Sequence, residues 1–245
     1  MPDVRARSYT EILDAAFEIY RRHFPTLFTI AAIGITPYTC AYFFAPGMPA
    51  QSLGLFYLLL FVGVLFNLFI ESALIVAASR AYLGTGDVDV ADAFRTGLAH
   101  PGRVLYVTWS KGLHIGLGFV ALIVPGFYMV VRYFAIPATA VLEDLPAKEA
   151  VKRSRELSEG YGKRILGVLV LAWVAYWMIA GVATAIGVTM LSNELGELLV
   201  RFVVGGLAFP FIAVVETLLY YDIRIRKEGF DVELMAAELD APAVA

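Results

Sequence analysis

Charged residues are scarce in this chain. Asp, Glu, Lys and Arg make up 17% of its 245 residues, against roughly 25% in soluble domains. Hydrophobic residues make up 60%, and no position from Phe24 to Ile70 carries a charge. A bilayer solvates such apolar surface, and a helix needs only about 20 apolar residues to cross it. The sequence therefore predicts an integral membrane protein whose first partner is the lipid bilayer.

The sequence also lacks the residues on which several classes of site depend. Its single cysteine, Cys40, cannot form an internal disulfide. It contains no HExxH, GxSxG or Walker-type motif, and no Cys and His set with the spacing of metal ligands. Ser110 and Lys111 are adjacent, and adjacent helical positions diverge by about 100 degrees, which argues against a catalytic pair. We therefore expect a protein that is not an enzyme and has no cofactor, metal site or nucleic-acid partner.

Turn residues divide the apolar sequence into six segments. The Pro125-Gly126 pair turns the third segment directly into the fourth, and the sequence SNELGE separates the last two. We predict one six-helix domain over residues 1–230, followed by a cytoplasmic C-terminal tail at 231–245. The six predicted spans are residues 24–44, 53–78, 103–124, 126–142, 165–191 and 198–221.

An amphipathic segment precedes each pair of spans. In the first, Ser8 and Glu11 have the spacing of a capping box, and apolar residues recur along one helical face. The segments that begin near Val90 and Ala147 repeat this pattern. They either mark a true internal repeat or show that loops against a bilayer tend to be amphipathic. The fold class that we predict is all-α, an integral membrane bundle of six transmembrane helices in three hairpins, each preceded by a cytoplasmic amphipathic helix.

Lys and Arg sort between the two sets of connections. The turns APGMPAQS, VPG and SNELGE contain none, whereas basic residues gather at 5–22, 80–103, 148–164 and 224–227. By the positive-inside rule, the basic connections lie in the cytoplasm. We therefore expect both termini on the cytoplasmic side.

Four charged residues lie inside the predicted spans at a similar depth. Glu71, Lys111, Arg132 and Glu216 each lie roughly eight to ten residues from a cytoplasmic helix end, which is one level at a rise of about 1.5 Å per residue. Because a charge near the bilayer centre costs on the order of 3 kcal/mol, two acids and two bases at one level are expected to pair. The cluster either fixes the packing of the helices or lines a cavity for a substrate, ion or proton.

Two stretches resemble a known family. PGFYMVVRYFAIPATAVLEDLPAKEAVKRSRELSEGYGKRILGVL and ETLLYYDIRIRKEGFD are similar to a group of bacterial membrane proteins often labelled the glycerophosphoryl diester phosphodiesterase membrane domain family. The resemblance covers the last half of the chain well and the first half only by topology. It implies a six-helix domain of the bacterial cytoplasmic (inner) membrane, without the phosphodiesterase barrel of fused members. The motif positions are Pro125, Gly126, Arg132, Pro137, Glu143, Ser154, Tyr221, Asp222, Arg224, Arg226 and Gly229.

These features favour a non-enzymatic membrane protein that anchors or assembles a membrane complex, with membrane or cytoplasmic proteins as possible partners. The alternative is a small transporter or lipid-binding module whose site is the charged level described above. The surroundings of that level discriminate between the two. Charges that pair in a dry core favour anchoring, and charges that face a cavity favour transport or lipid binding.

Overall fold

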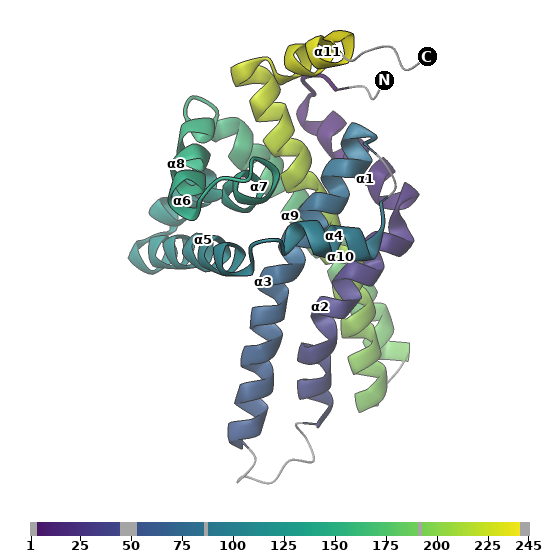
Figure 1. The fold of residues 1–245 in the computed structure, drawn as a ribbon. Helices are drawn as coiled ribbons and strands as arrows, with labels where there is room; N and C mark the ends of the chain where they lie inside the picture. Colours follow the sequence, from purple (N-terminus) through teal and green to yellow (C-terminus); the bar gives the residue numbers. More distant parts are fainter. Residues whose placement is uncertain (1–3, 45–52, 86–87, 191–192, 241–245) are drawn as a thin grey trace.

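The computed structural model describes residues 4–44, 53–85, 88–190 and 193–240, and all regular elements in these ranges are helices. The predicted all-α class is therefore confirmed. The helices, shown in Figure 1, are α1 (Tyr9–Arg22), α2 (Phe24–Phe44), α3 (Leu53–Leu83), α4 (Val90–Gly97), α5 (Pro101–Ala121), α6 (Ile123–Tyr133), α7 (Ile136–Leu142), α8 (Ala147–Ser158), α9 (Gly162–Met190), α10 (Glu194–Glu228) and α11 (Phe230–Asp240).

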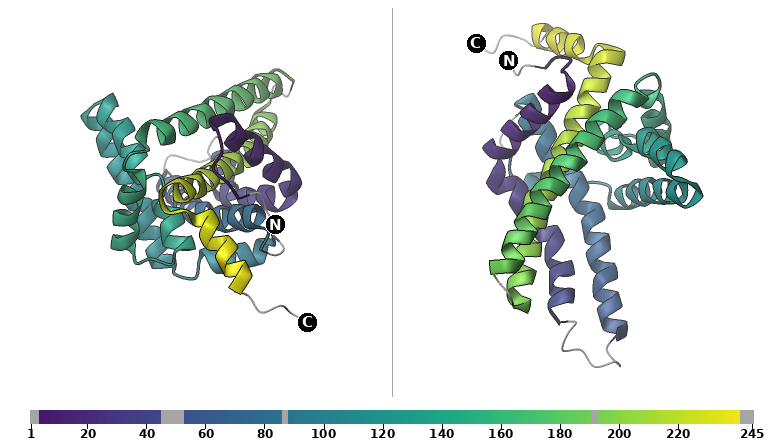
Figure 2. Two further views of the ribbon diagram at one scale, coloured as in Figure 1. Left: turned by 90° about the horizontal axis from the view of Figure 1, so that it is seen from above. Right: turned by 180° about the vertical axis from the view of Figure 1, so that it is seen from behind.

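Four long helices, α2, α3, α9 and α10, form the body of the molecule (Figures 1 and 2). Within it, α10 packs against α2, α3 and α9, and α2 packs against α3. The core includes Leu27 of α2, Leu74 of α3 and Leu218 of α10, which are all fully buried or nearly so. The helices α1 and α11 lie together at one end of this bundle (Figure 1).

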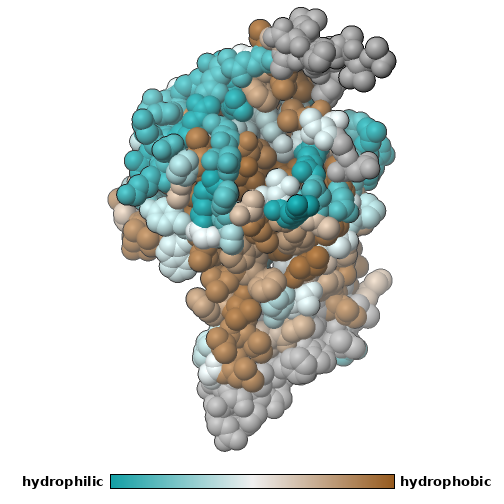
Figure 3. All heavy atoms as spheres, viewed as in Figure 1, coloured by the Kyte–Doolittle hydropathy of each residue, from teal (hydrophilic) through white to brown (hydrophobic). Residues whose placement is uncertain are grey.

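Among the described residues, five segments are long and apolar enough to cross a membrane. They are Phe24–Ala41, Gly54–Leu83, Ile123–Leu142, Gly162–Gly187 and Phe202–Glu228. On the face shown in Figure 3, hydrophobic residues predominate on the described part of the long helices away from α1 and α11. Hydrophilic residues gather in the half of the molecule that carries α1 and α11. Several long apolar helices thus support the expectation of a membrane protein. The predicted turn APGMPAQS, at 45–52, lies outside the described residues. In the predicted turn SNELGE, at 192–197, Asn193 caps α10 and the helix begins at Glu194, before the predicted start at 198.

The predicted arrangement of six spans in three hairpins is not confirmed, and the difference lies in the middle pair. The helix α5 runs across the long helices instead of alongside them, and α6 returns next to it (Figures 1 and 2). The segment predicted as one span over 126–142 is broken at Phe134 and Ala135 into α6 and α7. In addition, α5, which carries Arg103 and Lys111, is not among the segments that are long and apolar enough to cross a membrane.

The break between α6 and α7 has a local cause. Pro137 lies in the first turn of α7 and has no N–H, so the Tyr133 carbonyl lacks its normal helical donor. The fully buried Ser154 of α8 satisfies two neighbouring backbone groups at the break. Its hydroxyl accepts a hydrogen bond from the Ala135 N–H at 3.2 Å and donates one to the Arg132 carbonyl at 3.0 Å. Two family-motif positions, Pro137 and Ser154, therefore shape this bend.

Close backbone approach holds α5 against α6. A Cβ at Gly118 would lie 2.9 Å from Met129 Cγ and 3.0 Å from Gly126 Cα, and a Cβ at Gly126 would overlap the ring of Phe119. These contacts keep the hairpin of α5 and α6 tight. The chain turns at Leu122, and the Pro125-Gly126 pair predicted as the turn lies instead in the first turn of α6.

Substitution of Gly118 by alanine is expected to loosen this hairpin. Overpacking against backbone atoms costs about 1–3 kcal/mol, so the melting temperature of the purified protein should fall. Gly116→Ala is the matched control, because a Cβ at Gly116 meets no atom within 4 Å. In a helix it should be neutral or stabilising by up to about 1 kcal/mol. Equal melting temperatures for the two variants would contradict the proposed packing.

The three amphipathic segments are all helical. In α1, the Glu11 N–H donates to Ser8 Oγ at 3.3 Å and the Ser8 N–H donates to Glu11 Oε2 at 2.6 Å, which is the predicted capping box. The second and third are α4 and α8. At the other end of the chain, α10 continues past the predicted end at 221 to Glu228 and terminates at Gly229, which adopts a left-handed conformation with φ of 71°. The predicted tail at 231–245 contains most of α11.

Candidate functional site

Three of the four charged residues predicted to cluster do meet. Lys111 of α5 places its Nζ 2.8 Å from Oε1 of Glu71 on α3 and 3.0 Å from Oε2 of Glu216 on α10. Each side chain is only 15–19% exposed. We call Glu71, Lys111 and Glu216 the charged triad. It joins the transverse helix α5 to two long helices of the bundle.

Arg132, the fourth predicted member, lies elsewhere. Its Nη1 donates to the Arg155 carbonyl at 3.2 Å and to Glu159 Oε1 at 3.4 Å. The guanidinium also lies 5.8 Å from the ring centroid of Tyr128. The reason is that α6 packs beside α8 and does not run through the bundle at the level of Glu71 and Glu216. The expected neutral cluster is therefore replaced by a triad with one cation and two acids.

Two other polar residues near the predicted level also stay outside the triad. His114 Nδ1 lies 2.7 Å from the Ser110 carbonyl, and its ring lies 4.6 Å from that of Tyr133. The Asn67 amide donates to the Gly63 carbonyl at 3.2 Å. Both therefore have local partners that account for their polar groups.

The charged triad borders a cavity of about 540 Å³ between the hairpin of α5 and α6 and the helices α3, α9 and α10. Among the described residues that line this cavity, the three members of the triad are the only charged or polar ones, and the rest are apolar. Its aromatic lining residues are Phe119, Phe127, Phe134, Trp173, Trp177 and Phe209. We call this cavity the triad pocket.

The triad pocket opens to the outer surface of the helices. Val170 and Trp177 of α9 line it while their side chains are 42% and 66% exposed, and Phe127 of α6 also lies exposed at its wall. In a membrane protein, apolar side chains with this exposure face lipid tails. The pocket thus combines an apolar, lipid-accessible wall with a charged group at its side.

The part of the pocket wall that α9 contributes is visible in the sequence as a periodic pattern, although its residues were not among the predicted site residues. Its lining residues recur at the three- and four-residue spacing of one helical face, a pattern that marks a single surface on a helix. They are Leu166, Leu169, Val170, Trp173, Val174 and Trp177. Four of these six residues are exposed, so the same pattern would also arise on a helix that only contacts lipid.

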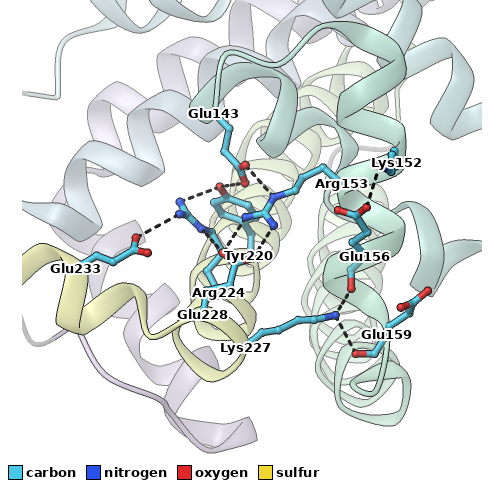
Figure 4. Close-up of polar contacts among 10 residues, drawn as sticks. All are labelled: Glu143, Lys152, Arg153, Glu156, Glu159, Tyr220, Arg224, Lys227, Glu228 and Glu233. Atoms are coloured by element: carbon cyan, nitrogen blue, oxygen red, sulfur yellow. Dashed lines mark hydrogen bonds and ion pairs between the residues drawn. The ribbon is translucent and has the colours of Figure 1, made fainter.

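A second polar network, shown in Figure 4, joins α7, α8, α10 and α11. Arg153 Nε lies 2.9 Å from Glu143 Oε2, and its Nη2 donates to Glu228 Oε2 at 2.7 Å. The Tyr220 hydroxyl donates to Glu143 Oε1 at 2.8 Å. Arg224 contacts Glu228 at 3.2 Å. Hydrogen bonds to Glu228 and Glu143 raise the pKa of Arg153 above its ordinary value despite partial burial. These groups satisfy one another, so the network stabilises the fold.

A third network surrounds Asp222, which is 2% exposed. Its Oδ2 lies 2.6 Å from Nε of Arg164 and 3.0 Å from Nε of Arg226, and its Oδ1 accepts the Arg7 N–H at 2.8 Å. Both arginines also donate to the Arg7 carbonyl. The neighbouring Tyr221 hydroxyl lies 2.6 Å from Ser79 Oγ. The motif positions in the last turns of α10 therefore hold the N-terminal segment and helices α3, α9 and α10 together.

The chain matches no protein-family model, and no curated protein or solved structure shows significant similarity to it. The resemblance of its second half to the glycerophosphoryl diester phosphodiesterase membrane domain family therefore stays a prediction. The function has to be argued from the charged triad and the pocket beside it.

Proposed function

We propose that the protein binds an amphiphilic molecule of the membrane. The hydrophobic part of the ligand occupies the triad pocket, and its polar head contacts the charged triad. The observation that carries this proposal is the position of the triad at the wall of a cavity of about 540 Å³. Small-molecule sites typically measure about 300–1,000 Å³ and combine apolar walls with a few convergent polar groups. The proposal corresponds to the lipid-binding alternative raised by the sequence.

The charges argue in the same direction. A pair of opposite charges can fix helix packing, but the triad carries one acid more than it needs for neutrality. An excess charge inside an apolar region is expensive and usually marks a functional site. An anchoring or assembly subunit has no need for a cavity next to such a group. If the protein bound no amphiphile, the anchoring function would therefore be favoured.

We further propose that the protein resides in the bacterial inner membrane with both termini in the cytoplasm. The basic residues of α8 and of the last turns of α10 lie at the end of the bundle that carries α1 and α11, and the positive-inside rule assigns that end to the cytoplasm. The hairpin of α5 and α6 then lies within one leaflet. In a variant whose native Cys40 is replaced by serine, a cysteine in place of the exposed Glu149 should react with an impermeant reagent only from the cytoplasmic side. Reaction only from the opposite side would refute this orientation.

The binding proposal is tested by filling the pocket from its lipid-exposed side. Val170 and Leu171 are neighbours on α9 and are both 42% exposed, but only Val170 lines the pocket. Val170→Trp is expected to lower the occupancy of a retained lipid about tenfold, because overpacking of a filled site costs about 1–3 kcal/mol. Leu171→Trp is the matched control and should retain the lipid as the unmodified protein does.

The measurement is native mass spectrometry of the protein purified in mild detergent. The unmodified protein is expected to carry one lipid that resists washing. Absence of any retained lipid, or equal loss from both tryptophan variants, would contradict a ligand in the triad pocket.

A further inference from the structure

We infer that the triad pocket selects amphiphiles whose head group is positively charged, such as an alkylammonium. This inference rests on the proposed function, because it names the class of ligand that the same pocket would take. It starts from the charge of the triad. Two carboxylates and one ammonium sum to a formal charge of −1, and no other charged residue in the described part of the chain lines the pocket.

The nearest candidates for neutralising this charge are already engaged. Arg132 contacts Glu159 and the Arg155 carbonyl and does not line the pocket. Arg164 contacts Asp222 and the Arg7 carbonyl at the end of the bundle. Among the described residues, Lys111 is therefore the only cation with access to the pocket. A bound monocation would bring the total formal charge of the site to zero.

The carboxylates have acceptor atoms to spare. Glu71 uses Oε1 and Glu216 uses Oε2 to contact Lys111, and no other donor in the ranges that the structure covers contacts either group. An ionised carboxylate can accept several hydrogen bonds on its two oxygens. Glu71 Oε2 and Glu216 Oε1 are thus available to the N–H groups of an ammonium head.

The aromatic lining favours the same class of ligand. Trp173, Trp177, Phe119 and Phe127 contribute ring surfaces to the pocket. Ring faces attract cations, Trp most strongly, and the attraction increases where water is excluded. An anionic head would instead raise the formal charge to −2 and would compete with two carboxylates for Lys111. A zwitterionic head would place its anionic part in the same position.

The test compares three probes that share a twelve-carbon chain: dodecylamine, which is protonated at neutral pH, dodecanol and dodecanoate. Their affinities are measured as competition for the lipid retained by the purified protein. Dodecylamine should bind about tenfold more tightly than dodecanol, since hydrogen bonds to charged groups contribute about 1.5–3 kcal/mol. Dodecanoate should bind most weakly.

Charge variants make the inference specific to the triad. Glu216→Gln and Glu71→Gln each bring the formal charge to zero while Lys111 keeps one carboxylate, so each should remove the preference for dodecylamine over dodecanol. The double variant carries a formal charge of +1 and should prefer dodecanoate. Glu149→Gln is the control, because it removes the same charge from the exposed face of α8.

The possible outcomes distinguish a failure of the charge selection from a failure of the proposed binding function. Equal binding of all three probes by the unmodified protein would overturn the charge selection and leave the proposed pocket standing. A preference for dodecylamine that survives both single substitutions would also overturn it, and these variants decide the matter even if the double variant does not fold. Failure of every probe to displace lipid would overturn the proposed function itself.

Discussion

Replacement of Lys111 by methionine is expected to lower the free energy of unfolding by about 3 kcal/mol, because removal of one partner leaves the others as buried, unpaired charges. Glu71 and Glu216 would then lie close together at the wall of the pocket with no cation between them. The expected result is a lower yield and a fall in melting temperature in detergent. Lys148→Met, at an exposed position on α8, is the matched control and should melt as the unmodified protein does.

A triple variant separates the effect of the unpaired charges from the lost packing of the Lys111 methylene groups. Adding Glu71→Gln and Glu216→Gln to Lys111→Met removes all three charges and should restore most of the lost stability. Arg132→Ala should have a smaller effect than Lys111→Met, since the Arg132 partner Glu159 is 62% exposed and such pairs contribute only about 0–1 kcal/mol. A larger effect at Arg132 would mean that it, and not Lys111, neutralises the buried acids.

Replacement of Asp222 by alanine is the second substitution with a large expected effect, again about 3 kcal/mol. Asp222 is 2% exposed and contacts Arg164, Arg226 and the backbone N–H of Arg7. Its loss would leave two arginines at the end of the bundle without their shared acid. It would also release the segment before α1, because the orientation of both arginines toward the Arg7 carbonyl depends on Asp222.

Limited trypsin digestion tests this prediction together with thermal melting. Cleavage after Arg7 should become faster in Asp222→Ala than in the unmodified protein. Asp14→Ala removes an exposed acid from α1 and should change neither the cleavage rate nor the melting temperature. Unchanged cleavage in a destabilised Asp222→Ala variant would show that other contacts hold the N-terminal segment.

The sequence predicted the elements whose signals are local. The first span was placed at 24–44, which matches α2, and the spacing of Ser8 and Glu11 identified the capping box of α1. The proximity of Glu71, Lys111 and Glu216 also followed from counting residues along the chain. These features depend on helix geometry and on the cost of isolated charges, and both can be read from a single segment.

The middle hairpin could not be predicted in the same way. An apolar hairpin exposes its side chains to lipid whether it crosses a bilayer or lies across the long helices, so hydrophobicity does not separate the two arrangements. Pro137 lies directly after the break between α6 and α7, but the hydrogen bonds that Ser154 of α8 makes at this break depend on a contact between helices. The prediction that Arg132 joins the cluster was wrong, because counting residues from the helix end assumes that α6 runs parallel to α3 and α10. The triad pocket arises from this same transverse packing.

The transverse hairpin also gives the molecule unequal widths along the bundle. The helices α4 to α8 flank the bundle in the half that carries α1 and α11, whereas the described part of the other half consists of the four long helices (Figures 1 and 2). In the proposed orientation, the two leaflets must therefore accommodate cross-sections of different area. A protein that is wider in one leaflet than in the other fits more easily where the membrane is curved. The curvature of the surrounding bilayer should therefore affect how well the protein packs in it.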